Sequence, residues 1–198
     1  LLFWFKPKSP GKLKLLLSFS GAYLLAITLL HIVPEVYESD KSLAGIFILL
    51  GFVLQLVLEF LSGGIEHGHF HFHSKNEKNF PITLMISLCI HTFLECLPLA
   101  NMDNHHGLFS GSSGYSLVTG IILHNIPVSI TLMSVLLQSG ISKKSVFLSL
   151  FIFAAMGPIG ILSGAVFKTT LLSLSPHFFE LAMGIVVGIF LHVSTTIL

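Results

Sequence analysis

Charge is what this sequence has least of. Lysine, aspartate and glutamate together make up 10% of its 198 residues, and arginine is absent, whereas about 25% of a soluble domain is charged. A soluble protein of this length needs more charge to cover its surface, and without a basic patch nothing indicates a nucleic-acid partner. The two cysteines, Cys89 and Cys96, fall inside one apolar segment. No disulfide framework is implied, and we interpret both as small buried residues.

Long apolar runs take the place of charge. Apolar residues make up 53% of the chain, and the mean hydropathy is +0.90. A membrane-spanning helix needs about 20 apolar residues, and six runs of about that length are present, at 15–36, 43–62, 80–100, 115–138, 145–167 and 178–198. The runs are continuous rather than alternating, which excludes a transmembrane β-barrel. A soluble all-helical core is the alternative, but six runs without a polar face argue against it. The sequence predicts an all-α integral membrane protein, a polytopic bundle forming one domain over residues 1–198.

The lysines predict how the bundle is oriented. Counted in the segment before each run, they number 4, 1, 2, 0, 2 and 1. Lysine-rich connections favour the cytoplasmic side. We therefore expect the start of the first run, the loop 63–79 and the turn 140–144 to lie on the cytoplasmic side of the membrane. Residues 1–5 read like the end of a further apolar span.

The loop 63–79 is rich in histidine at alternating positions. On a flexible segment these imidazoles could reach one borderline metal ion together. The alternatives are a solvated polar loop or a trace of an affinity tag, although a tag is not expected in mid-chain with Gly and Phe interleaved. The candidate metal-binding residues here are His67, His69, His71 and His73.

Ionisable residues inside the third run are the clearest functional signal. Such groups cost several kcal/mol in a bilayer core, so they need a partner or a function. His91 and Glu95 are four positions apart, which stacks them on one face of a helix. The pair can share a divalent cation or form a structural ion pair. Thr92 lies on the adjacent flank, and Pro98 is expected to kink or open the helix.

The fourth run repeats this arrangement with His124, Asn125 and Pro127. Pro127 is expected to interrupt the helix beside His124, and interrupted helices recur around midplane sites in membranes. His124 alone could equally be a satisfied core histidine. Nitrogen donors with one carboxylate suit Zn²⁺ first, then Fe²⁺ and Mn²⁺, whereas Mg²⁺ and Ca²⁺ require more oxygens.

Other polar residues in the runs are weaker candidates. His31 and Glu35, again four apart, could form an entrance site or an interfacial pair near the outer face. Glu59 is interpreted as a snorkelling residue at a helix end rather than part of an exit. His192 could be a gate or a packed core residue. Residues 157–160, Gly-Pro-Ile-Gly, predict a kink with close helix packing.

Taken in order, these motifs resemble the Zrt-/Irt-like (ZIP) family of divalent-metal transporters over nearly the whole chain. The similar segments are 19–35, the histidine-rich loop, 91–95, 124–127, 157–160 and 188–193. The resemblance implies eight spans, of which the first and last would be absent from this sequence. It also implies metal transport into the cytoplasm across the plasma or inner membrane, with no enzymatic activity and no cofactor. The expected partners are a divalent metal ion and the lipid bilayer, with a homodimer as a further candidate.

The resemblance also assigns site residues. His91, Glu95 and His124 are expected to be metal ligands, and Asn125 a ligand to a second metal. Thr92 stands where family members often have Asn. The largest departure is Val128, which replaces the glutamate that would bridge two metals, so we expect one metal, bound more weakly or differently.

Two alternatives follow from Val128 and from the polar residues of the third run. The first is a metal-sensing or regulatory membrane protein with a degenerate site. The second is an intramembrane metalloenzyme using His91 and Glu95, which is the weakest because the sequence has no His-Glu-x-x-His motif.

Overall fold

The structure is a computed structural model that describes residues 10–39, 42–62, 80–101, 112–171 and 178–197. Every regular element in these ranges is helical, which confirms the all-α prediction. The four histidines predicted to bind metal in the loop 63–79, His67, His69, His71 and His73, lie outside the described residues.

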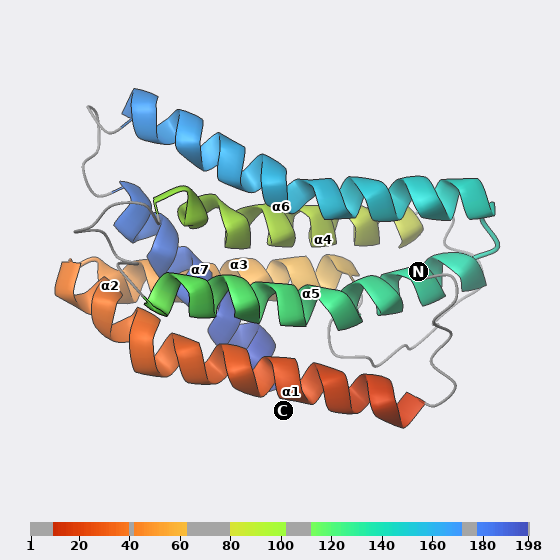
Figure 1. The fold of residues 1–198 in the computed structure, drawn as a ribbon, viewed down its shortest axis with the longest axis horizontal. Helices are drawn as coiled ribbons and strands as arrows, with labels where there is room; N and C mark the ends of the chain where they lie inside the picture. Colours follow the sequence, from red (N-terminus) through yellow and green to blue (C-terminus); the bar gives the residue numbers. More distant parts are fainter. Residues whose placement is uncertain (1–9, 40–41, 63–79, 102–111, 172–177, 198) are drawn as a thin grey trace.

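Six helical segments occupy the positions of the six predicted runs (Figure 1). The first is composite, since the helix α1 passes through a π-helical turn, η1, into α2. The third segment in the same way ends in a 3₁₀ turn, η3, where Pro98 lies, so the predicted opening of this helix is confirmed. The elements are α1 Pro10–Ile27, η1 Thr28–Ile32, α2 Val33–Ser39, α3 Ala44–Ser62, α4 Phe80–Cys96, η3 Leu97–Asn101, α5 Ser112–Gln138, α6 Lys143–Leu171 and α7 Phe178–Ile197.

Pro127 behaves differently from Pro98. It lies inside α5, which continues without a break to Gln138, so the predicted interruption of this helix is wrong. Thr131 donates its hydroxyl to the Pro127 carbonyl at 2.8 Å. Neighbouring hydroxyls of this kind help membrane helices to tolerate proline.

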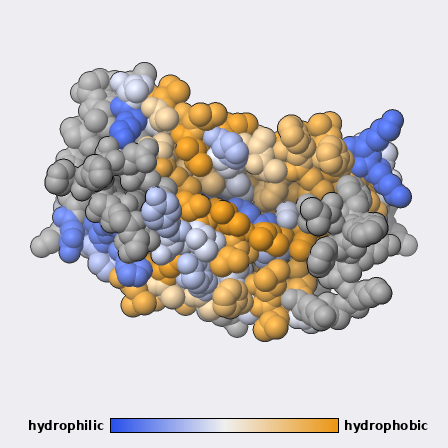
Figure 2. All heavy atoms as spheres, viewed as in Figure 1, coloured by the Kyte–Doolittle hydropathy of each residue, from blue (hydrophilic) through white to orange (hydrophobic). Residues whose placement is uncertain are grey.

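Five described segments are long and apolar enough to cross a bilayer: Leu13–Glu38, Ala44–Ser62, Ile82–Ala100, Gly114–Gln138 and Lys143–Thr169. The described apolar part of α7, Leu181–Ile197, is shorter. In Figure 2 apolar residues dominate the middle of the bundle, and hydrophilic residues gather towards its two ends. Large apolar side chains such as Phe60 and Leu162 are exposed on the outer faces, as expected where lipid is the solvent. The chain is a multi-pass membrane protein.

Glycines set the closest contacts between helices. α3 packs along α7, and α4 packs along α6. A Cβ atom added to Gly51 of α3 would lie 2.0 Å from the Ile185 carbonyl oxygen of α7, so only glycine fits there. At Gly160 of α6 the added atom would lie 2.5 Å from the Phe93 carbonyl oxygen of α4. The close packing predicted for residues 157–160 is confirmed, and it holds in position the helix that carries His91.

Candidate metal site

His91 and Glu95 meet one helical turn apart on α4, as their spacing predicts. His91 Nε2 lies 2.8 Å from Glu95 Oε1, and the two side chains are 1% and 0% exposed. α4 forms here because its residues make one continuous apolar run, and the four-residue spacing brings both polar groups to its inward face. Both groups are thus removed from water and lipid.

His124 joins this pair from the neighbouring helix α5. Its ring centroid lies 6.2 Å from that of His91, and the two ring planes meet at 67°. One ligand atom from each of His91, Glu95 and His124 lies within 4.8 Å of the others, and all three residues are buried. Among the described residues this is the one group of three or more His, Cys, Asp or Glu side chains close enough to share a metal ion.

His91 lies at the centre of the candidate membrane span Ile82–Ala100. His91 is eleven residues after the start of α4 at Phe80, which is roughly 16 Å along a helix at 1.5 Å per residue. The hydrocarbon core is about 30 Å thick. A metal ion held here would lie roughly halfway across.

The Glu95 carboxylate lacks the donors that a buried anion normally has. Neither of its oxygens has a hydrogen-bond partner in the part of the chain that the structure describes. His91 Nε2 lies close to the carboxylate, at 2.8 Å from Oε1, but this contact is not a hydrogen bond. A buried carboxylate without donors is costly, and a cation bound by both atoms would compensate for its charge. Two imidazole nitrogens and one carboxylate oxygen are donors that suit Zn²⁺.

Gln55 is a polar neighbour of the site that sequence reasoning missed. It lies on α3, is 0% exposed, and its Oε1 is 2.9 Å from His91 Nδ1. A signal was present, because Gln55 is the one amide side chain in the run 43–62, and polar residues inside a span usually have a function. Its partner, however, is 36 positions away.

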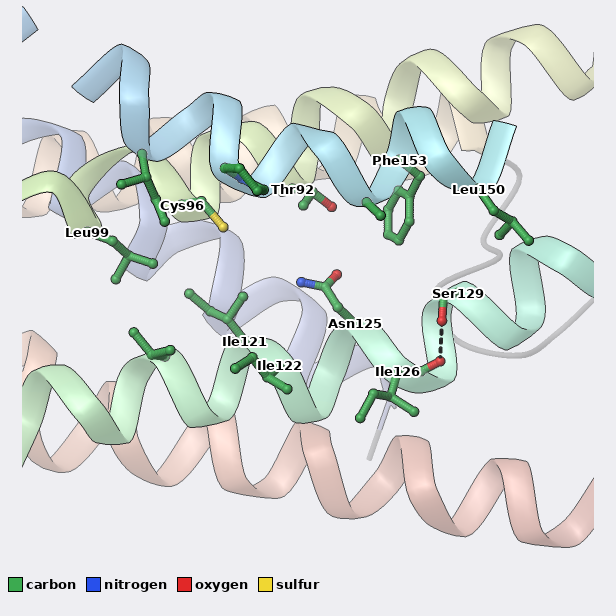
Figure 3. Close-up of a pocket in the computed structure, with 15 residues that line it drawn as sticks. Thr92, Cys96, Leu99, Ile121, Ile122, Asn125, Ile126, Ser129, Leu150 and Phe153 are labelled. Carbon is green, nitrogen blue, oxygen red and sulfur yellow. Dashed lines mark hydrogen bonds between the residues drawn. The ribbon is translucent and has the colours of Figure 1, made fainter. Parts of the chain in front are cut away.

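Thr92 and Asn125 line a cavity beside the three residues. The cavity, about 440 Å³ in volume, lies between α4, α5 and α6, and its other lining is mostly apolar apart from Cys96 and Ser129. Figure 3 shows Asn125 reaching from α5 into the space below Thr92 and Cys96. Thr92 Oγ1 and Asn125 Oδ1 have no hydrogen-bond partner among the described residues. Their assignment as metal ligands stays a prediction.

His31 and Glu35 lie away from this group. His31 is exposed in the π-helical turn, and Glu35 is half-buried on α2. Neither belongs to the cluster of possible ligands around His91. An outer entrance site at these residues therefore remains a prediction.

Glu59 and His192 form a pair that the sequence interpretation missed. The Glu59 carboxylate on α3 contacts Nε2 of His192 on α7, and the Phe52 ring packs at nearly a right angle to the same imidazole, with the ring centroids 4.9 Å apart. Treating Glu59 as a snorkelling end residue was wrong, because its carboxylate has a partner inside the bundle. His192 is packed in the core, as one of the two interpretations predicted, yet it is also paired.

Val128 lies one helical turn beyond His124, where the family resemblance places a glutamate. The side chain is 1% exposed and belongs to an apolar cluster with Leu84 and Leu88 of α4 and Leu132 of α5. The candidate metal group therefore contains Glu95 as its one carboxylate.

Comparisons with known proteins agree with the geometry. The sequence model of the ZIP zinc transporter family matches residues 67–198, more than half of the chain and including all three clustered residues. Searches of curated proteins and of solved structures found no match. The chain belongs to the ZIP zinc transporter family and is a multi-pass membrane protein of divalent-metal transport.

Proposed function

We propose that this protein carries a divalent transition-metal ion, Zn²⁺ before Fe²⁺ or Mn²⁺, into the cytoplasm through a site made by His91, Glu95 and His124. The observation that carries the proposal is the convergence of these three buried side chains within 4.8 Å at mid-depth in the bundle. A carboxylate without hydrogen-bond donors is strongly unfavourable among apolar helices, and a bound cation would compensate for it.

The number of ligands supports a transported ion rather than a structural one. Structural zinc sites have four protein ligands, whereas sites with three keep a position for water or an incoming group. Ligand exchange through that position allows an ion to arrive and to leave. The oxygens of Asn125 and Thr92, which line the adjacent cavity, are candidates to coordinate a partly hydrated ion as it enters or leaves the site.

Inward transport is the direction that the family resemblance implies, and the predicted orientation indicates which loops lie on each side. The lysine distribution favours a cytoplasmic position for the loop 63–79, where His67, His69, His71 and His73 would receive or sense the ion. His31 and Glu35 would then assist on the outer side.

Radiometal uptake into proteoliposomes tests the proposal. We expect His91→Ala, Glu95→Ala and His124→Ala to reduce ⁶⁵Zn uptake at least tenfold, because each removes one of three ligands. Cys89→Ala is the matched control, since it alters a half-buried side chain on the same helix without touching the group. Uptake at the parent rate by His91→Ala or Glu95→Ala would show that the site is wrong.

A metal sensor is the second candidate function, favoured by the apolar Val128. Such a protein would bind metal at His91, Glu95 and His124 without moving it. Zinc binding by the purified protein, lost in His91→Ala but without uptake by the parent, would identify the sensor. The metalloenzyme stays the weakest candidate, because a His-Glu-x-x-His sequence is absent.

A further inference from the structure

The contact between Gln55 and His91 bears on how the metal site works. We infer that Gln55 is a positioning residue, which sets the tautomer and ring orientation of His91 so that the lone pair for metal binding lies on Nε2. The inference rests on the proposed function of His91 as a ligand. Its physical basis is the 2.9 Å contact between His91 Nδ1 and Gln55 Oε1, made where both side chains are buried.

The acceptor character of the amide oxygen selects one tautomer. A neutral imidazole carries one N–H, and the nitrogen without hydrogen is the one that can bind a metal. An amide oxygen only accepts, so it favours the hydrogen on Nδ1. The lone pair then lies on Nε2, the atom 2.8 Å from Glu95 Oε1.

Without Gln55 the population of the opposite His91 tautomer, with its hydrogen on Nε2, would increase. A hydrogen on Nε2 could be donated towards Glu95, and this would occupy both the nitrogen and the carboxylate that the metal requires. Gln55 therefore determines which of two tautomers His91 adopts. In one tautomer His91 donates a hydrogen towards Glu95, and in the other His91 and Glu95 can bind a metal ion together. Groups that bond the second nitrogen of a ligating histidine commonly act in this way.

α3 and α7 together hold Gln55 in place. Gly51, one turn before Gln55, packs against the α7 backbone, and Glu59, one turn after it, pairs with His192 of α7. These two contacts restrict both sliding and rotation of α3 along α7. The helix α3 contributes no ligand to the group of His91, Glu95 and His124, yet it helps to set the geometry of His91.

Ser87 offers a matched control for the effect of simply removing a contact between α3 and α4. Its hydroxyl donates to the Leu58 carbonyl at 2.5 Å, in a buried position one turn before His91 on α4. Ser87→Ala removes a hydrogen bond between the same two helices and leaves the His91 ring untouched.

Zinc affinity of the full chain in detergent or nanodiscs gives the first test. We expect Gln55→Leu, which lacks the acceptor, to weaken Zn²⁺ binding 10- to 100-fold, about the effect of losing such a group at other metal sites. Gln55→Glu keeps an acceptor and should bind at least as tightly as the parent, and Ser87→Ala should bind within threefold. Parent-like affinity in Gln55→Leu, or an equal loss in Ser87→Ala, would overturn the inference.

The tautomer itself gives a second test that needs no metal. In protein with ¹⁵N-labelled histidine, the His91 signals, assigned by their loss in His91→Asn, should show the Nδ1–H form in the parent and in Gln55→Glu. Gln55→Leu should lose that preference. An Nε2–H form in the metal-free parent contradicts the inference even if Gln55→Leu does not fold. If His91→Ala binds zinc like the parent, the proposed site fails, whereas the role of Gln55 in setting the tautomer is decided separately by these spectra.

Discussion

Glu59 of α3 and His192 of α7 are paired, although 133 positions separate them in the chain. Each is the one ionisable residue in the apolar core of its own helix, 44–62 and 181–197. Their pairing explains how two charged or polar groups are tolerated there, because each compensates for the desolvation of the other. It also links the two helices that pack at Gly51.

The pair is expected to contribute to stability cooperatively. His192 is 4% and Glu59 24% exposed, so solvent screens the contact only in part. A double-mutant cycle with Glu59→Ala, His192→Ala and the double variant should give a coupling of about 1–2 kcal/mol in the free energy of unfolding. Unfolding monitored by circular dichroism in detergent measures it, and strictly additive single effects would exclude the coupling.

Replacing Val128 with glutamate should lower the stability of the metal-free protein and raise its affinity for zinc. Val128 is 1% exposed among leucines, so an uncompensated carboxylate there should destabilise the metal-free protein by about 3 kcal/mol or more. The new carboxylate would lie one turn from His124, where a bound Zn²⁺ would attract it. We expect tighter zinc binding, measured by competition with a chelating dye.

Val128→Gln is the control for this substitution, since glutamine has nearly the same volume as glutamate but no charge. It should lose comparable stability without the gain in zinc affinity. Equal zinc affinity in Val128→Glu and the parent would mean that residue 128 points away from the metal.

Gly160→Ala should disturb the site through the backbone. The added methyl would lie 2.5 Å from the Phe93 carbonyl oxygen, so α6 and α4 must separate. We expect a loss of about 1–3 kcal/mol in stability and weaker zinc binding, because α4 carries His91 and Glu95. Gly157→Ala, whose new atom would lie 3.4 Å from the Cys96 sulfur, should change both quantities little. Equal unfolding temperatures for the two variants would contradict this account of the packing.

The donor set predicts an order of preference among metals. Two imidazoles and one carboxylate favour Zn²⁺ over Fe²⁺ and Mn²⁺, and all three over Mg²⁺ and Ca²⁺. Competition of unlabelled ions against ⁶⁵Zn uptake should follow that order. Inhibition by Mg²⁺ at concentrations similar to those of Mn²⁺ would indicate a site with more oxygen ligands than the three clustered residues supply.

Part of the site was predictable because helix geometry is local. A four-residue spacing places His91 and Glu95 on one face of any helix, whatever surrounds it. His124 was expected near them only through its depth in the next run and the family resemblance. Gln55 and the Glu59–His192 pair were not predicted, because contacts across 36 and 133 positions depend on which helices are neighbours.

The sequence by itself determined that this protein is a bundle of membrane-spanning helices and approximately where each span lies, although the first predicted run, 15–36, falls inside a longer helical segment, 10–39. The reason is that the length and continuity of an apolar run suffice to define a span. Only the tertiary structure decided which faces meet. In a membrane protein, lipid-facing and buried side chains are equally apolar, so exposed Phe60 and buried Leu58 on α3 look alike in sequence. The choice of neighbours was settled by close backbone contact at glycines such as Gly51 and by the few polar side chains, Gln55 among them, that had to find partners.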